Sequence, residues 1–460
     1  MRAERDSMGE MSVPDDVLYG ASTQRAVLNF PISGRPLPEP FIRSLGLVKL
    51  ACARANEELG LLPAARSGLI QAAAREIVDG RLNRHFPIDV FQTGSATSTN
   101  VNANEVIANR ASQLAGEPLG SQRPVHPNDD VNLGQSSNDV IPTALHVSVA
   151  VALHARLAPA LRRLAAELSG RAEAFSAVVK IGRTHLMDAT PLTLGQEFSG
   201  YAAQAAKAAD RADRAVARLR ELAIGGTAVG TGLNTSPEFA ARVCRILSAE
   251  TGLEFVEAAN HFEAQAARDD LVEVAGALAA IAAALTKIAN DVRLLGSGPR
   301  AGLGELRLPA TQPGSSIMPG KVNPVMSEML VQVGLAVQGL TQTAVLCGRE
   351  GHLELNATLP LLAHCLHEAI HLLANGVTVF TTRCVAGLEA DGARCRELVE
   401  RSLMLVTALN PLIGYDAAAA VAKEAFASGR TLREVVLERK LLDAATLDRV
   451  LDPGRMTGPG

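Results

Sequence analysis

The pattern of apolar and polar residues changes along the chain. In the first third, short helical patterns alternate with breaks rich in Pro and Gly, such as 34–40 and 122–130. From Val140 onward, apolar residues recur at helical spacing over long, Ala-rich stretches. Five long helices are predicted from this spacing, at 140–168, 197–222, 262–295, a stretch that begins after Asn323, and 359–380. After Glu389 the helical patterns become short again.

Long helices separated by Gly-rich breaks predict an all-α protein with a central helical bundle. We place three domains along the chain: a mixed, mainly helical N-terminal domain at 1–135, a long-helix bundle at 136–389 and a small helical C-terminal domain at 390–460. Several bundle helices, such as the Ala-rich stretch at 264–290, have little polar face. A helix that is apolar all round is buried in something larger than its own bundle, so we expect the chain to oligomerise.

Composition supports helices and narrows the function. Ala and Leu dominate, there is no Trp, and the net charge is −4, from 44 basic and 48 acidic residues. A balanced charge gives no support for binding nucleic acid or anionic membranes. The N-terminus lacks an apolar signal segment, and we see no apolar run long enough to span a membrane, so a cytoplasmic location is expected.

The cysteines offer no recognisable metal or redox motif. The six cysteines form no C-x-x-C pair and show neither iron–sulfur nor zinc spacing. We therefore expect six buried free thiols, no metal and no cofactor.

The segment PGSSIMPGKVNP, at 313–324, carries the most chemical information. Its prolines and glycines exclude a continuous helix or strand, so it is expected to form a loop. Asn323 and Pro324 are expected as the N-cap and first residue of the next helix, which then carries Glu328 just over one turn in. Hydroxyls, the charge of Lys321 and a helix N-terminus together suit a carboxylate ligand.

Three further segments combine small polar residues with helix starts. The segment from Gln92 is rich in Ser and Thr; that from His126 leads through Ser136, Ser137 and Asn138 into the helix from Val140. His126, Asn128 and Asp129 form a polar cluster, more typical of a hydrogen-bonded turn than of a metal site. In the segment from Lys180, His185 lies in a polar break between long helices, where a carboxylate partner would make it an effective acid or base.

Two Gly-rich segments complete the set. GGTAVGTGLNT at 225–235 does not follow a predicted strand, which excludes a dinucleotide-binding loop; GHLELN lies at 351–356. The chain also lacks a Walker A motif, H-E-x-x-H and G-x-S-x-G.

Together these segments resemble the fumarase/aspartase superfamily. PGSSIMPGKVNP is similar to its signature loop almost letter for letter, and within the superfamily the chain resembles class II fumarases. The likeness runs from DSMGEMSVP and TQRAVLNFPISG, through FPIDVFQTGS, to SLMLVTALNPLIGYD. It implies a five-helix bundle domain, a homotetramer with a twenty-helix core, and active sites that each draw on three chains.

The resemblance also implies a reaction and a set of residues. The reaction is the reversible hydration of fumarate to (S)-malate in the tricarboxylic acid cycle, by a hydro-lyase that needs no cofactor and passes through an aci-carboxylate intermediate. Ser315 would be the base at C3, with Lys321 helping to stabilise its alkoxide, and His185 paired with Glu328 would act through a water on the hydroxyl side. The residues that would hold the substrate are Ser95, Thr97, Asn100, Ser136, Ser137, Asn138, Thr184, Lys321 and Asn323. His126, Asn128 and Asp129 match a secondary dicarboxylate site.

Some positions depart from the family pattern, and other readings remain open. Ala96 stands where Gly is usual, Met187 replaces a common Gln, and Arg349 and Glu350 alter the Gly-rich approach to GHLELN. Aspartate ammonia-lyase is the nearest alternative, and another fumarate-releasing lyase of the same superfamily is a further one. Aspartate ammonia-lyase typically has Gln in place of His185 and Ala in place of Gly320. A non-catalytic structural protein on this fold, like some lens crystallins, would not need to keep all four of Ser315, His185, Glu328 and Lys321.

Overall fold

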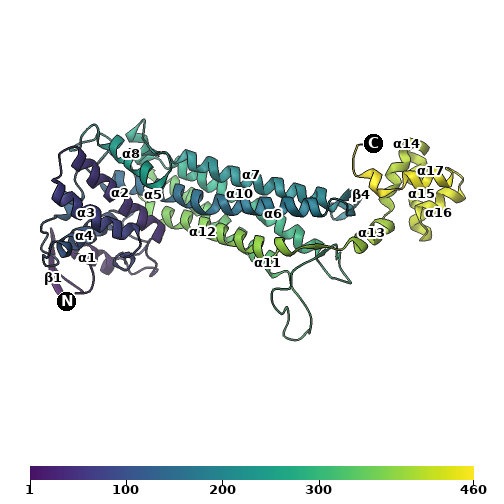
Figure 1. The fold of residues 1–460 in the computed structure, drawn as a ribbon, viewed down its shortest axis with the longest axis horizontal. Helices are drawn as coiled ribbons and strands as arrows, with labels where there is room; N and C mark the ends of the chain where they lie inside the picture. Colours follow the sequence, from purple (N-terminus) through teal and green to yellow (C-terminus); the bar gives the residue numbers. More distant parts are fainter. Residues whose placement is uncertain (460) are drawn as a thin grey trace. The chain divides into compact units, whose positions relative to one another are not determined.

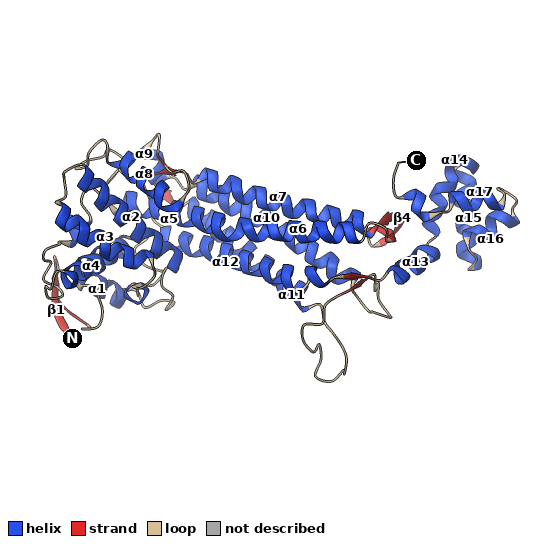
Figure 2. Cartoon of the chain, in the orientation of Figure 1, coloured by secondary structure: helices blue, strands red, loops and turns tan. Residues whose placement is uncertain are grey.

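The structure, a computed structural model that describes residues 1–459, is predominantly helical (Figures 1 and 2). The described chain is 62% helical and forms 17 α-helices, which confirms the all-α class. The strands among these residues form five separate two-stranded pairs, so no larger sheet organises the described fold.

The long helices that the periodicity predicts are present. They are α5 (Ser137–Ala152) continued by α6 (Ala158–Ala174), α7 (Leu194–Arg218), α10 (Asp269–Leu295), α11 (Val325–Gly348) and α12 (Leu359–Arg383). A π-helical turn at Leu153–Leu157 joins α5 to α6. The stretch predicted as one helix from 262 is divided, because the short helix α9 (His261–Ala266) ends before α10 begins.

The chain divides into two compact units, which we describe separately. The first comprises Met1–Pro159, Ala209–Ala283 and Val333–Ala374; the second comprises Ala160–Ala208, Ala284–Gln332 and the chain from Asn375 onward. The three domains expected from the sequence stay a prediction.

The first unit is centred on α2 (Glu39–Glu58), which packs against α3 (Ala64–Val78), α5 and α8 (Phe239–Thr251). Its apolar residues Leu45, Val48 and Ala51 are completely buried. The remaining elements of this unit are β1 (Arg2–Asp6), β2 (Gly9–Val13), α1 (Ala21–Asn29), η1 (Asn83–His85), α4 (Thr97–Leu114), η2 (Pro127–Val131), β5 (Glu221–Leu222), β6 (Val256–Glu257), β8 (Gly351–His352) and β9 (Leu355–Asn356). Helices α2 and α4 are longer than the short patterns expected in the first third of the chain.

The second unit contains a hairpin and the C-terminal helices. Strands β3 (Val179–Thr184) and β4 (Met187–Thr193) form the antiparallel hairpin, in a segment that the sequence pattern marks only as a break between helices. Ile181 of β3 is buried in the same core as Val399, Leu409 and Val435. The other elements here are β7 (Leu306–Arg307), η4 (Val385–Gly387), β10 (Glu389–Ala390), α13 (Gly392–Arg401), η5 (Leu403–Leu409), α14 (Asn410–Ile413), α15 (Tyr415–Ser428), α16 (Leu432–Glu438), α17 (Ala444–Val450) and η6 (Pro453–Met456).

Four helical stretches are long and apolar enough to cross a membrane, judged by length and composition alone. They are Ser137–Ala174, Asp269–Leu295, Val325–Gly348 and Leu359–Gly387. The expectation that no apolar run reaches this length is therefore wrong; charged residues lie mainly near the ends of these helices. The apolar window of Ser137–Ala174 is 72% buried within the chain, but that of Val325–Gly348 only 33%. Apolar surface left uncovered to this extent marks a face that contacts something else.

The prediction for the cysteines is confirmed. All six are buried and none forms a disulfide. Burial raises the pKa of the Cys244 thiol to about 12, so this group stays protonated and unreactive.

Candidate active site

The structure brings four sequence motifs together in the first unit. The hydroxyl of Thr97, at the start of α4, lies 2.8 Å from the hydroxyl of Ser95 and 2.8 Å from that of Ser137. Asn138 donates its side-chain amide to the carbonyl of Ala228 at 2.8 Å, which ties the loop 225–235 to the same place. The result is a surface of small hydroxyl and amide groups contributed by segments far apart in sequence.

The residues that follow GHLELN join this cluster through the main chain. The amide of Leu359 donates to the carbonyl of Gly94 at 2.9 Å. A Cβ at position 94 would collide with the carbonyl of Ala357, so only glycine permits this approach.

Helix α5 begins at this surface with a well-formed cap. The Ser136 side chain accepts a hydrogen bond from the main-chain amide of Asn138, and Asp139 completes a capping box. The N-terminus of such a helix favours an anion, as the sequence suggested. Asp139 also accepts from the main-chain amides of Gly225 and Thr227, at 3.1 and 3.0 Å. One buried carboxylate therefore holds both loops.

Two buried charges in this unit escaped the sequence analysis. Burial raises the pKa of Asp139 to about 6, although three main-chain amides oppose the rise. Lys49 of α2 is fully buried and donates to Asn132 and Gln135, at 2.9 and 3.0 Å, and burial lowers its pKa to about 8. Asn100, a predicted substrate residue, donates to the same oxygen of Asn132. The sequence signal that could have identified Lys49 is a lysine within an apolar helical pattern.

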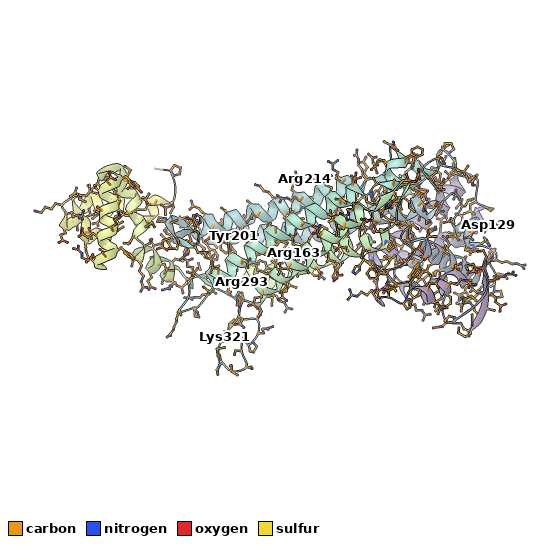
Figure 3. The ribbon with its side chains drawn as sticks, turned by 180° about the vertical axis from the view of Figure 1, so that it is seen from behind. Asp129, Arg163, Tyr201, Arg214, Arg293 and Lys321 are labelled. Carbon is orange, nitrogen blue, oxygen red and sulfur yellow. The ribbon has the colours of Figure 1, made fainter. Side chains whose placement is uncertain are left out.

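The predicted secondary site is also a compact cluster. The Nδ1 atom of His126 accepts from the main-chain amides of Asn128 and Asp129, at 3.3 and 3.1 Å. The Asp129 carboxylate lies 3.3 Å from the same nitrogen. We interpret this cluster as a hydrogen-bonded turn. Asp129 itself is exposed (Figure 3).

In the second unit, the 313–324 segment forms a loop, as predicted. The side-chain oxygen of Ser315 accepts from the main-chain amides of Ile317 and Met318, at 3.2 and 3.0 Å. At the base of the loop, the amide of Gly314 donates to the carbonyl of Lys321 at 2.8 Å. A Cβ on Gly314 would lie 2.5 Å from that carbonyl oxygen, so glycine is required here. The side chain of Lys321 is exposed on the loop (Figure 3).

The expected cap at the end of this loop is wrong. Helix α11 begins at Val325, one residue after Pro324, and Asn323 uses its side-chain amide to donate to the carbonyl of Gly314 at 2.7 Å. The Asn323 side chain therefore closes the loop instead of capping the helix, because its amide is the donor that the Gly314 carbonyl needs. Glu328 lies in the first turn of α11, half-buried.

His185 occupies the turn of the β3–β4 hairpin. Thr184 pairs with Met187, so His185 and Leu186 are the two central residues, with φ of 57° and 63°. Such a turn normally uses Asn-Gly, because left-handed backbone is strained for other residues. The His185 side chain is exposed. No hydrogen bond or ion pair joins His185, Glu328 and Ser315 to one another within the described chain.

Strained backbone marks the predicted motifs independently. Eight non-glycine residues among those described have positive φ, and six of them lie in the motif segments: Ala96, His185, Leu186, Thr227, Asn234 and Leu353. Strain of this kind persists where surrounding structure enforces it and gathers at functional sites. The φ of Ala96 is 55°, a conformation that Gly adopts without cost. This is a physical reason for the Gly that is usual at this position.

Metal-binding geometry is not found in the part of the chain that the structure describes. Among residues 1–459, no three His, Cys, Asp or Glu side chains are grouped so as to hold a metal ion.

Comparison with known proteins identifies the class. The family described as "Lyase" matches residues 9–339, and the family described as "Fumarase C C-terminus" matches residues 405–458. The crystal structure of a recombinant class II fumarase from Schistosoma mansoni superposes with a TM-score of 0.97 at 40% identity, covering 100% of this chain and 99% of that one. The fold and the motifs thus define a lyase with the fumarase/aspartase fold.

Sequence relatives narrow the class further. "Fumarate hydratase class II 2" of Bradyrhizobium diazoefficiens is 52% identical over 459 residues, covering 100% of this chain and 97% of that protein. Mitochondrial fumarate hydratase of Mus musculus is 50% identical over 460 residues, covering 100% and 90%. The chain belongs to the class II fumarate hydratase family. Members of this family act on small dicarboxylates and are oligomeric.

Proposed function

We propose that this chain catalyses the reversible hydration of fumarate to (S)-malate, as a hydro-lyase. Membership of the family over the whole chain supports this reaction. The observation that carries it is the environment of Ser315, whose oxygen accepts two main-chain N–H groups in a loop with Lys321.

Ser315 acts as the base in the direction of dehydration. A serine hydroxyl is a weak base and needs local activation. The amides of Ile317 and Met318 supply it, because they donate to the oxygen that bears the negative charge of the alkoxide. The alkoxide takes the proton from C3 of malate, and the electrons of the C3–H bond pass into the neighbouring carboxylate as an aci-carboxylate. They return to form the double bond as hydroxide leaves from C2 with a proton, as water.

His185 and Glu328 act on the hydroxyl side, through a water. The left-handed turn presents the imidazole of His185 at the tip of a hairpin. Because no bond joins His185 to Glu328 within one chain, we assign their contact to residues of different copies. Anti geometry requires the two groups to flank the substrate from opposite faces.

The carboxylates of the substrate are held by small hydroxyl and amide side chains. These hydrogen-bonding groups fit carboxylate oxygens, and the N-terminus of α5 adds favourable dipoles. The proposed set is Ser95, Thr97, Asn100, Ser136, Ser137, Asn138, Thr184, Lys321 and Asn323. The cluster of His126, Asn128 and Asp129 is proposed as a secondary dicarboxylate site.

A homotetramer with active sites shared between copies explains the uncovered helical faces. The exposed face of α11 carries Gln332, Gln338 and Gln342 beside Leu335, which is 65% exposed. Side-chain amides are costly in lipid but pair readily with a neighbouring helix. We therefore assign these faces to other copies in a twenty-helix core and not to a membrane. Bacterial relatives support a cytoplasmic location, and the reaction needs no cofactor.

Aspartate ammonia-lyase activity is the alternative. His185 and Gly320 stand where that enzyme typically has Gln and Ala, and both favour the hydratase. The test incubates the purified chain with fumarate alone and with fumarate plus ammonia, then identifies the products. Malate in both samples supports the proposal; aspartate without malate overturns it.

A further inference from the structure

The second unit contains a completely buried carboxylate that the mechanism does not use. The side chain of Glu305 is 0% exposed, and its two oxygens accept from Nη1 of Arg183 at 3.0 and 2.9 Å. The ammonium of Lys180, 2% exposed, lies 3.4 Å from Glu305 and 2.9 Å from the carboxylate of Glu197. Two cations and two anions therefore form one network, in which Glu305 and Lys180 are buried and Arg183 and Glu197 are partly exposed.

Both cations belong to the strand that ends at His185. Arg183 directly precedes Thr184, the last residue of β3, and Lys180 is the second residue of the same strand. Residues three apart on a regular strand point to opposite faces. A register irregularity between Ile181 and Arg183 interrupts the alternation, which allows both side chains to reach the same carboxylate. The bulge and the network together fix how the strand approaches its turn.

The main chain of Glu305 is anchored as firmly as its side chain. Its amide donates to the carbonyl of Leu295 at 2.9 Å, and its carbonyl accepts from the amide of Asp391 at 2.9 Å. Strand β7 follows immediately and pairs with β10. Glu305 is therefore fixed by its main chain to the end of α10 and to Asp391, and by its side chain to β3.

Stability alone gives a poor reason for this network. Glu305 and Lys180 lose nearly all of their hydration, and a buried ion pair is often no more stable than well-packed apolar residues of similar volume. Its advantage is a fixed geometry. The turn at His185 and Leu186 needs such support, because both residues hold left-handed backbone without glycine.

We propose that Glu305 is a positioning residue, which through Arg183 and Lys180 holds the His185 turn in place. The proposal rests on the proposed function of His185. It makes no claim that Glu305 touches the substrate.

The test is Glu305→Gln in the full-length protein, which keeps the size of the side chain and removes its charge. We expect kcat to fall by about 10–100-fold, the range seen when a supporting partner of a functional side chain is lost. KM should change by less than about threefold, because the proposed carboxylate contacts are retained. Hydrogen exchange in the 182–188 segment should become faster.

The matched control is Glu76→Gln. Glu76 also accepts from one arginine with both oxygens, at 3.0 and 2.9 Å from Arg110, but it lies on α3, opposite the C-terminal end of α4, and is not among the proposed site residues. This variant should lower stability without changing kcat or the exchange of 182–188. A normal kcat in folded Glu305→Gln would overturn the proposal, and so would an equal loss of kcat in the control.

A second pair of variants decides the question if Glu305→Gln does not fold. Arg183→Lys keeps a cation opposite Glu305 and should retain more kcat than Arg183→Gln, at similar KM. Equal kcat in the two would refute the proposal. Failure of the proposed function is distinct, because the unmodified chain would then form no malate from fumarate.

Discussion

Ser315→Ala is the substitution that tests the proposed mechanism most directly. The Ser315 oxygen accepts two main-chain N–H groups, at 3.2 and 3.0 Å. Each such bond contributes about 0.5–1.5 kcal/mol to a neutral acceptor and about 1.5–3 kcal/mol to a charged one. Ionisation of the hydroxyl therefore gains about 2–3 kcal/mol from the pair, which corresponds to a roughly 30- to 150-fold larger alkoxide population.

The expected loss combines this activation with the proton transfer itself. Without the oxygen, turnover should fall by roughly 10²–10⁴-fold, the usual contribution of a positioned general base. Binding of a dicarboxylate inhibitor should persist, because the proposed carboxylate contacts belong mainly to other residues. Turnover is followed by the loss of fumarate absorbance, and the proton-transfer step by exchange of the C3 hydrogen of malate in D₂O.

The neighbouring serine provides a matched control. Ser316 lies in the same loop and is exposed, and its side chain forms no hydrogen bond with the residues that the structure describes, so the turnover of Ser316→Ala should stay close to normal. More than a tenth of normal turnover in Ser315→Ala would refute the base assignment. Equal losses in both variants would mean that the serines only shape the loop.

Four further outcomes are expected. His185→Asn and Glu328→Gln should each lower turnover, and the double variant should be little worse than the worse single one, whereas fully additive losses would separate the two groups. Hydrogen exchange at 314–320 should slow when a dicarboxylate inhibitor binds, and an unchanged rate would argue against loop closure. Burial lowers the pKa of His367 from 6.5 to about 4, so its contribution to stability is complete above pH 6.5 and is lost as pH falls through 4. In urea unfolding, the free energy of unfolding should fall between pH 7 and pH 5 by about 2 kcal/mol less in His367→Gln than in the unmodified chain. An equal fall in the two proteins would contradict this. Chelators and air should leave the hydration rate unchanged, and activity restored by iron would contradict a cofactor-free reaction.

The long helices were predictable because helical periodicity is a local signal. Helix α10, for example, follows from a run of Ala and Leu with few interruptions. The β3–β4 hairpin was not predictable in the same way. Charged Lys180 occupies a buried position, which hides the strand alternation, and the turn uses His-Leu where Asn-Gly is the recognisable signal.

The candidate site was also predictable only in part. Motifs indicated which residues carry chemistry, but the pairs they form depend on distant segments. Thr97 meets a hydroxyl 40 residues away, and Arg183 meets a carboxylate 122 residues away. Nothing in the sequence near Arg183 identifies Glu305 as its partner. A charged side chain needs such a partner only once burial has removed the solvent around it.

The left-handed non-glycine residues of the motif segments have a consequence for how this protein can evolve. Asn tolerates this backbone, so five residues other than Asn234 carry the strain, and at about 1–2 kcal/mol for each they together approach the stability margin of a whole domain. Selection for heat resistance alone would favour glycine or asparagine at Leu186 and Ala96 long before it improved the core. Lineages kept under selection for turnover should retain these residues, so sequence drift here records which pressure acted on an ancestor.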